Sequence, residues 1–482
     1  MSDSLGPGHS LSSDDPDERG ENARMPFGRA IGLTVLGALV PGFGLIGAGR
    51  RKAGLTVLVV FLALAGGAAY LVTSGQRTVL HWAVQPEALQ ILGIALPALG
   101  LAWVVVIAAT FRSLGPWPAG PVRRVVSYGL VSVLILLAMV PLSVAGRYAL
   151  IQKGVVEHVF ADRESRSATR PTKVTPADPW AGESRVNVLL LGGDGGPDRV
   201  GVRPDTIVLA SIDTRTGATV LFSLPRNLRY VPFAPGTALA NAYPHGVYAG
   251  GGDQLEWMLN SIYENVPEQN PGLLKSDNPG ADATKLAVSG ALGLKVDYYV
   301  LVNLKGFQQL IDALGGITVN VNHRVAKGGE ADAGLVPGGW IEPGPDQHLD
   351  GFDALWFARG RYGADDYQRM GRQRCVIQAI IDQADPVRLT TRYEALARTS
   401  RDLVSTDIPA SLLPAFVDLS LRVKGASVTS ISFTNEVIDP SLPDYEKVHS
   451  LVLEEVRASG TSKDTSMFGT SLRDACAYSP EG

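Results

Sequence analysis

Hydrophobic residues are unevenly distributed along the 482-residue chain, and three long apolar runs dominate its first third. The runs cover residues 54–73, 91–111 and 125–145, and each has about the ~20 residues that a helix needs to cross ~30 Å of hydrocarbon. Between Lys52 and Arg112 the only formally charged residues are Arg77 and Glu87. Buried core helices rarely follow one another in this way, so the pattern predicts three transmembrane helices.

A fourth apolar run, residues 31–48, is interrupted by Pro41, Gly42, Gly44 and Gly47, which disfavour a straight helix. If this run spans the membrane from a cytoplasmic N-terminus, the basic clusters at 50–52 and 123–124 face outward, against the positive-inside rule. If it is a re-entrant or interfacial hairpin, both clusters lie in the cytoplasm. We therefore predict a membrane region at 29–147 with a hairpin at 31–48. A four-span chain with its N-terminus outside is the alternative, and both arrangements place everything after residue 146 outside.

The segment before the membrane region, residues 1–28, is acidic and contains no apolar period in its first 23 residues. Such a segment cannot bury enough apolar surface to offset the entropy of ordering, so we predict a disordered cytoplasmic tail. The whole chain has 43 Lys and Arg against 47 Asp and Glu, a net charge of −4, which argues against a nucleic-acid partner. The predicted protein is therefore a multi-pass protein of the cell membrane.

After a polar, proline-containing linker at 148–184, strand and helix patterns alternate. β-Branched and leucine-rich runs predict strands at 186–193, 206–213, 218–225, 297–304 and 317–321. Helical spacing appears at 253–263, 307–314, 352–357 and 368–383. These elements predict an extracytoplasmic α/β (α+β) domain at 185–438, with a mixed central sheet flanked by helices, and a loosely ordered C-terminal extension at 439–482.

Charged residues gather beside the predicted strand ends. Asp194 leaves the first strand in a Gly-Gly-Asp-Gly-Gly turn, Arg203 and Asp205 directly precede the second strand, and Arg226 follows the third. A glycine-rich turn lets the backbone approach a phosphate, although Gly-Asp-Gly is also an ordinary hairpin turn. The absence of a following Gly-Lys-Ser/Thr excludes a Walker loop.

A second cluster, RGRYGADDYQRMGRQ at 359–373, is richer in charge and contains no lysine. Arg369 and Arg372 share a helix face, with Gln373 beside them. Arginine forks match phosphate oxygens, so the cluster is a candidate pyrophosphate clamp, whereas the alternative is a solvated, salt-bridged helix face. The residues of this cluster that enter the hypothesis are Arg359, Arg361, Asp366, Arg369, Arg372 and Gln373.

Read in order, the blocks LLLGGDGG, RPDT, SLPRN, DYYVLVNLKGFQQLIDALGGITVNV, HLDGFDALWFARGR and DDYQRMGRQ resemble the LytR-CpsA-Psr family. The resemblance covers roughly residues 185–438. It implies a membrane-anchored phosphotransferase that moves a glycosyl phosphate from a polyprenyl-pyrophosphate-linked glycopolymer onto a peptidoglycan hydroxyl. A non-catalytic polyprenyl-pyrophosphate-binding scaffold or regulator, and a polyprenyl-pyrophosphate hydrolase, are the alternative interpretations.

The resemblance also implies roles for individual residues. Asp194 and Asp205 correspond to carboxylates that hold Mg²⁺ or Mn²⁺, and Asp205, Arg361 and Asp366 are the candidate catalytic residues. The residues that correspond to the pyrophosphate ligands are Arg203, Arg226, Arg359, Arg361, Arg369, Arg372 and Gln373. The polyprenyl tail needs an apolar tunnel, which the leucine- and valine-rich strands and the helix at 307–314 can line, although they serve equally well as an ordinary core.

Two positions depart from the family pattern. Asn227 stands where the family usually has Asp after Pro-Arg, and Leu239 and Ala240 precede Asn241 where the family tends to have Lys. Both changes remove charge from the expected site. The two cysteines, Cys375 and Cys476, either pair in an oxidising exterior or remain a buried small hydrophobe and an exposed thiol.

Overall fold

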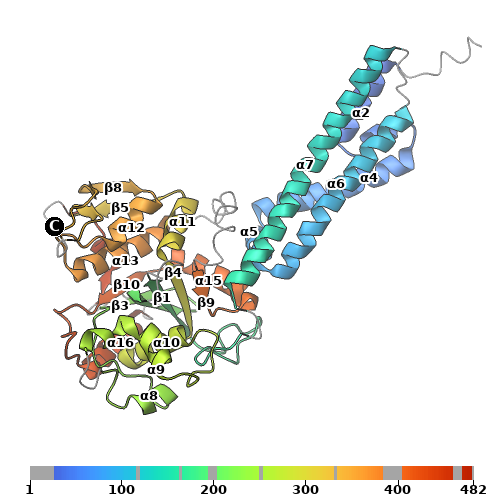
Figure 1. Ribbon diagram of the computed structural model, residues 1–482. Coiled ribbons are helices and arrows are strands. Elements are labelled where there is room, and N and C mark those ends of the chain that lie inside the picture. The colour runs from blue at the N-terminus through green and yellow to red at the C-terminus, as the bar shows by residue number, and fades with distance from the viewer. Residues whose placement is uncertain are drawn as a thin grey trace, which may run out of the picture. The chain divides into compact units, whose positions relative to one another are not determined.

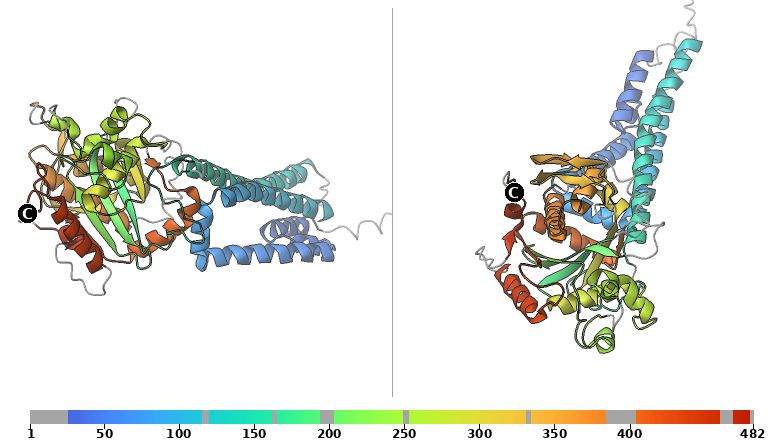
Figure 2. Two further views of the ribbon diagram at one scale, coloured as in Figure 1. Left: turned by 90° about the horizontal axis from the view of Figure 1, so that it is seen from below. Right: turned by 60° about the vertical axis from the view of Figure 1, so that its left-hand side comes forward.

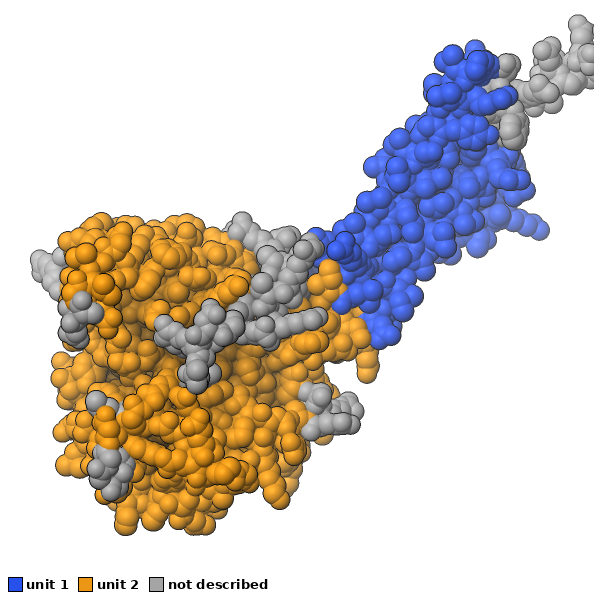
Figure 3. Space-filling model, viewed as in Figure 1, with its two compact units in different colours: residues 1–76, 90–150 blue, residues 77–89, 151–482 orange. Residues whose placement is uncertain are grey.

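The computed structural model describes residues 26–114, 120–161, 165–193, 203–248, 253–330, 334–383, 404–459 and 469–479. The predicted tail at 1–28 lies almost entirely outside them. Two compact units are present: residues 1–76 with 90–150, and residues 77–89 with 151–482 (Figure 3).

Among the described residues, three helices are long and apolar enough to cross a membrane, as the hydrophobic runs predict. They are α4 (Arg51–Thr73), α6 (Pro86–Leu114) and α7 (Pro121–Val159), and a short helix, α5 (Gln76–Val84), lies between the first two in the sequence. Each extends beyond its predicted run, and the 39 residues of α7 give a length of roughly 58 Å at 1.5 Å per residue. At most 17% of each hydrophobic stretch is buried, which suits a lipid environment.

The fourth apolar run forms two short helices, α2 (Phe27–Leu39) and α3 (Phe43–Gly47). They are separated at Gly42, whose φ of +97° is in the left-handed region. A Cβ on Gly37 would lie 3.0 Å from the Cα of Gly44, so the two helices pack closely because small residues face each other. The 13 residues of α2 give roughly 20 Å of helix, less than the ~30 Å of a hydrocarbon core. The re-entrant or interfacial location of the pair remains a prediction.

The second unit is built on a seven-stranded mixed sheet with the order β11-β10-β3-β2-β1-β4-β9. Strand β1 runs parallel to β4, and β3 runs parallel to β10, while the other neighbours are antiparallel. The bounds are β1 (Arg185–Gly193), β2 (Pro204–Asp213), β3 (Thr219–Leu224), β4 (Tyr298–Asn303), β9 (Val404–Thr406), β10 (Val428–Ser432) and β11 (Thr470–Ser471). The predicted mixed sheet is confirmed.

Helices cover both faces of this sheet (Figures 1 and 2). One face carries α9 (Ile262–Gln269), α10 (Pro279–Leu292) and α16 (Tyr445–Ser459). The other carries α11 (Leu304–Leu314), α12 (Gly351–Arg359) and α13 (Asp366–Gln383), together with two small sheets, β5 (Ile317–Val321) with β8 (Gly344–Leu349) and β6 (Val325–Lys327) with β7 (Gly339–Ile341). Further helices of this unit are α8 (Ala238–Ala242), α15 (Leu413–Lys424) and α17 (Leu472–Ala475).

The strands are hydrophobic on both sides because both faces are covered. Leu209 and Phe222 belong to the large core under α10 and α16, whereas Val208 and Leu221 pack in a smaller core with residues of α13 and α17. Successive residues of a strand therefore reach opposite cores, as the period of two requires.

One predicted helix is wrong. Residues 253–263 form two 3₁₀ turns, Gln254–Trp257 and Leu259–Ser261, and α9 begins only at Ile262. The amide of Leu259 donates to the carbonyl of Leu228, and the amide of Asn260 donates to the carbonyl of Arg226. These tertiary hydrogen bonds to the loop after β3 override the helical pattern.

The domain reaches further along the chain than 185–438. Helix α7 runs through residue 159, into the predicted linker, and after it the backbone amides of Arg166 and Ala168 donate to Asp277 and Asp282. Beyond residue 438, α16 buries Val448 and Val452 in the core. A disulfide joins Cys375 of α13 to Cys476, so the end of the chain is fastened to the domain.

Candidate active site

Charged side chains meet at one edge of the sheet because of the strand directions. Gly193, at the end of β1, pairs with Pro204, at the start of the antiparallel β2, and Ile207 of β2 pairs with Leu224 at the end of β3. Asp205 and Arg226 therefore lie at the same edge. The parallel strand β4 also ends there, because Gly193 is the register partner of Asn303.

Arg226 and Arg369 connect the carboxylates of Asp205 and Asp366. Arg226 Nη1 lies 2.7 Å from Asp205 Oδ1, and its Nε lies 3.7 Å from Asp366 Oδ1. Arg369 Nη2 lies 3.0 Å from Asp366 Oδ2 and donates to the Asp205 carbonyl at 3.1 Å. Arg361 Nη1 lies 3.9 Å from Asp366 Oδ1. These five residues, Asp205, Arg226, Arg361, Asp366 and Arg369, are called the active-site cluster below.

The cluster has more positive than negative charge and is partly shielded from water. Three arginines face two aspartates, and the Arg369 side chain is only 2% exposed. Burial lowers the pKa of Arg369, while the nearby charges of Asp366 and Asp205 raise it. Two buried atoms, Asp366 Oδ1 and Arg369 Nε, have no hydrogen-bond partner among the described residues. An excess of arginine, together with the donor Arg369 Nε, suits an anionic ligand.

An apolar cavity of about 200 Å³ borders the cluster, between the sheet and helices α11, α12 and α13. Asp205, Asn303, Arg359, Arg369 and Gln373 are its charged and amide-bearing lining residues. Most of the remaining lining is aliphatic or aromatic: Leu190, Leu191, Val300, Val302, Leu304, Phe307, Leu310, Leu355, Ala358, Val376, Ile377 and Ile380. The strands and the helix at 307–314 thus line an apolar cavity, as one of the two sequence interpretations proposes.

Helix α13 shows how one element serves both the charged and the apolar part. Arg369, Gln373, Val376 and Ile380 all line the cavity, and their spacing of four, three and four residues places them on one helix face. Along this face the side chains change from cationic through amide to apolar. The sequence predicted the helix at 368–383 that carries this face, but Val376, Ile377 and Ile380 were not assigned to the site.

The structure places other predicted ligands outside the cluster. Arg203 pairs with Glu256 and, at 3.3 Å, with Glu264, and these hydrogen bonds raise its pKa. Arg372 donates to the carbonyl oxygens of Phe357, at 2.7 Å, and Gly360. Burial lowers the pKa of Arg372 to about 10, and the charge of Arg369 adds to this shift.

Two of the remaining predicted ligands border the cavity. Gln373 donates to the Ala358 carbonyl at 3.2 Å, so with Arg372 it fixes the end of α12, where Arg359 and Arg361 follow. Arg359 lines the cavity and lies 5.8 Å from the ring centroid of Trp356. Asp194 lies outside the described residues.

Two further features bear on the predicted site. Asn303, which sequence reasoning missed, lines the cavity and caps α11, since its Oδ1 accepts from the Gly306 amide at 2.8 Å. Its position between a predicted strand and a predicted helix was the available signal. Asn227, the departure from the family pattern, is exposed in the turn after β3.

The LytR_cpsA_psr family matches residues 149–458, nearly two thirds of the chain. The chain belongs to this family. The match includes α16 and the end of α7, in agreement with the extent of the folded domain.

Two named relatives of this family member are polyisoprenyl-teichoic acid–peptidoglycan teichoic acid transferases TagU. The protein from Oceanobacillus iheyensis is 31% identical over 227 residues, which cover 46% of this chain and 59% of the relative. The protein from Enterococcus faecalis is 30% identical, with coverage of 46% and 61%. The alignments thus span about three fifths of each relative. A solved structure, TagV of B. subtilis, is 20% identical, covers 62% of this chain and 99% of its own, and has a TM-score of 0.38.

Proposed function

We propose that this family member is a membrane-anchored transferase that moves a glycosyl phosphate from a polyprenyl-pyrophosphate-linked glycopolymer onto a hydroxyl of peptidoglycan. The proposal rests mainly on one observation: the active-site cluster directly borders the apolar cavity. A polyprenyl pyrophosphate has the same two parts, an anionic head and an apolar tail. The names of the two TagU relatives describe a transfer between a polyisoprenyl-linked polymer and peptidoglycan, which supports this choice of donor and acceptor.

In the proposed reaction the acceptor hydroxyl oxygen attacks the phosphorus that carries the sugar. A new P–O bond forms, the bond from this phosphorus to the bridging oxygen breaks, and the polyprenyl phosphate leaves with that oxygen. Phosphoryl transfer requires mainly positioning and neutralisation of charge. Arg226, Arg361 and Arg369 supply that neutralisation, and the missing charge at Asn227 leaves them in place.

Asp366 is the proposed acceptor for the hydroxyl proton. Its Oδ2 is held by Arg369 at 3.0 Å, while its Oδ1 has no hydrogen-bond partner among the described residues. A carboxylate with one oxygen fixed by an ion pair and the other not hydrogen-bonded can take a proton without losing its orientation. Arg372 and Gln373 act as positioning residues, because they hold the end of α12 beside the cluster.

The carboxylates also fit a hard divalent cation such as Mg²⁺ or Mn²⁺. The carboxylate of Asp205 is a suitable oxygen donor, and Asp194 is the second proposed carboxylate. Among the described residues, no three His, Cys, Asp or Glu side chains gather into a metal site. Phosphate oxygens and water would therefore complete the coordination, and the ion would supply further neutralisation of the pyrophosphate charge.

We place the catalytic domain on the outer side of the membrane, as the distribution of basic residues predicts. The disulfide between Cys375 and Cys476 supports this assignment, because disulfides persist mainly in oxidising compartments. In this arrangement α4, α6 and α7 span the membrane.

The proposed function is tested with the full chain in lipid nanodiscs, a polyprenyl-pyrophosphate-linked glycan, peptidoglycan fragments and Mg²⁺. The substitution Arg361→Ala removes a cation that stabilises the developing charge, so we expect transfer to fall by about 10²–10³-fold. Arg473→Ala, at an exposed arginine of α17 with 73% of its side chain accessible, is the matched control and should leave transfer unchanged.

The product identifies the reaction. Glycosyl phosphate attached to peptidoglycan supports the transferase, whereas free glycan phosphate in the presence of acceptor would show a hydrolase. Tight donor binding without either product, unaffected by metal, would replace the proposal with a non-catalytic binder.

A further inference from the structure

A second hollow of the same domain, with a volume of about 820 Å³, is lined by the loop after β3, by α10 and by the start of α16. Its lining includes the rings of Tyr230 and Tyr445, the prolines Pro235 and Pro244, and the apolar side chain of Leu442. We call it the tyrosine groove. None of its lining residues belongs to the active-site cluster or to the apolar cavity.

Tyr230 is held in an unfavourable backbone conformation. Its φ of +50° lies in the left-handed region, where a bulky side chain is a true outlier. Neighbouring hydrogen bonds enforce it: the Arg229 amide donates to the Pro440 carbonyl at 3.0 Å, the Tyr445 hydroxyl donates to the Arg229 carbonyl at 2.7 Å, and the Val247 amide donates to the Val231 carbonyl at 2.9 Å. Strain that surrounding contacts maintain in this way is typical of functional sites.

This conformation directs an aromatic pair to the surface. The rings of Tyr230 and Tyr248 stack with centroids 6.2 Å apart and planes at 25°. Tyr230 is 36% exposed and Tyr248 is 49% exposed, and Leu442 beside the groove is 74% exposed. Exposed aromatic rings offer apolar faces with a negative quadrupole, which attract the weakly positive C–H groups on the face of a sugar ring.

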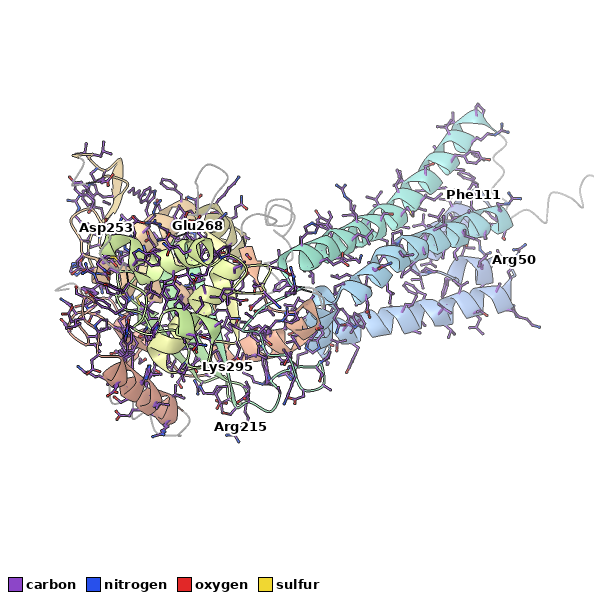
Figure 4. All side chains as sticks on the ribbon, turned by 60° about the horizontal axis from the view of Figure 1, so that its bottom comes forward. Arg50, Phe111, Arg215, Asp253, Glu268 and Lys295 are labelled. Atoms are coloured by element: carbon purple, nitrogen blue, oxygen red, sulfur yellow. A yellow bond between two sulfur atoms is a disulfide. The ribbon has the colours of Figure 1, made fainter. Side chains whose placement is uncertain are left out.

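The charges of the groove favour an uncharged ligand. Its lining has one lysine and one glutamate, Lys295 and Glu446, together with the histidines His245 and His449. Lys295, labelled in Figure 4, already pairs with Asp297 at 3.0 Å. A polyanionic chain such as a teichoic acid would need an excess of cations, as the active-site cluster has. A neutral glycan requires only aromatic faces and scattered polar groups.

The loop itself connects the groove to the active-site cluster. Tyr230 follows Arg226 by four residues, so their Cα atoms are at most about 14 Å apart. The far end of the loop is attached to α10, because the Ala234 amide donates to the Leu286 carbonyl at 3.0 Å. The groove extends from Lys295, before β4, to Tyr230, so a glycan strand of several sugars that runs through it past Tyr230 would extend along the loop toward a phosphate held by Arg226.

We propose that the tyrosine groove binds the neutral glycan strand of the peptidoglycan acceptor and brings one of its hydroxyl groups to the phosphate site. This inference rests on the proposed function and deepens it. Tyr230 and Tyr248 form the sugar-stacking platform, and the apolar edge formed by Leu442 and the prolines accommodates acetamido methyl groups.

The direct test measures binding of chitotetraose, the tetramer of N-acetylglucosamine, to the full chain in nanodiscs by calorimetry. Tyr230→Asn removes the ring, and Asn tolerates a positive φ, so the fold should be retained. We expect affinity to fall about tenfold, which corresponds to about 1.4 kcal/mol. Tyr230→Phe should recover most of the loss. Tyr478→Ala, at a tyrosine that is 37% exposed near the end of the chain, is the control.

In the transfer assay Tyr230→Asn should raise the KM for the acceptor more than it lowers kcat. If the wild-type protein transfers glycan but neither binds chitotetraose nor responds to Tyr230→Asn, the inference is overturned while the proposed function stands. If it binds chitotetraose through Tyr230 but never transfers, the groove stands and the proposed function fails. Stronger competition by poly(glycerol phosphate) than by chitotetraose would overturn the choice of a neutral ligand.

Discussion

Among the described residues, two groups of charges that include buried members differ in how completely they are paired. In the first, the Lys285 cluster, Lys285 of α10 is fully buried and lies 2.6 Å from Asp407 and 3.8 Å from Asp282. Asp282 accepts from the hydroxyls of Ser167 and Thr169, and Asp407 also accepts from a backbone amide. Lys285 donates in addition to a backbone carbonyl at 2.9 Å.

The active-site cluster is different in each of these respects. It has more arginines than carboxylates, contains buried atoms without partners among the described residues, and borders a cavity. Buried charges that are paired and hydrogen-bonded fasten parts of a protein together, whereas an open and unbalanced group is prepared for a ligand. The Lys285 cluster fastens residues 167–169 to α10 and to the segment after β9. Burial alone therefore does not distinguish a binding site; here the excess of arginine and the adjoining cavity do.

The largest expected effect is on stability and concerns the Lys285 cluster. Lys285→Met leaves Asp407 buried without its cation, so we expect a loss of about 3–5 kcal/mol in the free energy of unfolding. Chemical denaturation of the full chain in detergent measures it. Lys305→Met, at an exposed lysine of α11, is the control and should change stability by less than about 0.5 kcal/mol. Equal effects of Lys285→Met and Lys305→Met would contradict the structural role of the Lys285 cluster.

The second expected effect is on activity and concerns the active-site cluster. Asp366→Asn keeps the shape of the side chain and removes the proposed proton acceptor, so transfer should fall by about 10²–10⁴-fold. Stability should fall less than in Lys285→Met, because Asp366 is 26% exposed and Arg369 keeps its contacts with Asp205. Transfer kinetics and thermal melting of the same preparation measure the effect on activity and the effect on stability separately. A large loss of stability with unchanged transfer would show that this cluster too is structural.

The smallest expected effect is a pH dependence. Burial raises the pKa of Asp407 above its ordinary value, although Lys285 opposes the shift and Asp282 adds to it. The folded state then binds more protons than the unfolded state above about pH 4, the ordinary range of Asp. The contribution of Asp407 to stability should therefore fall as the pH rises from about 4 toward its raised pKa, and this contribution should be absent in Asp407→Asn. Melting curves of both proteins from about pH 4 to pH 7 measure it, and identical slopes would contradict the shift.

Much of the architecture was predictable because local patterns carry it. The hydrophobic runs predicted the three long helices, and five predicted strands correspond to β1 to β5 within a few residues. The glycine and proline residues of the fourth apolar run predicted its interruption. Asp205, Arg226, Arg361, Asp366 and Arg369 were all candidate residues, and the structure brings them together.

The remaining features depend on contacts between distant segments. No local pattern shows that Arg203 pairs with glutamates or that Arg372 donates to backbone carbonyls. Nor does any local pattern show that Lys285, inside an apolar helix, pairs with Asp407, 122 residues away. The pairing of Cys375 with Cys476 was left open for the same reason.

The sequence by itself determined the long apolar helices, most strands and the set of charged residues from which the site is drawn, because periodicity and composition are properties of neighbouring residues. Only the tertiary structure decided which charges face one another, where an apolar cavity remains, and which tyrosine is held in a strained conformation at the surface. Which charged side chains pair depends on strand order and on loops that bring distant residues within a few ångströms of each other. Neither is a property of a short stretch of chain.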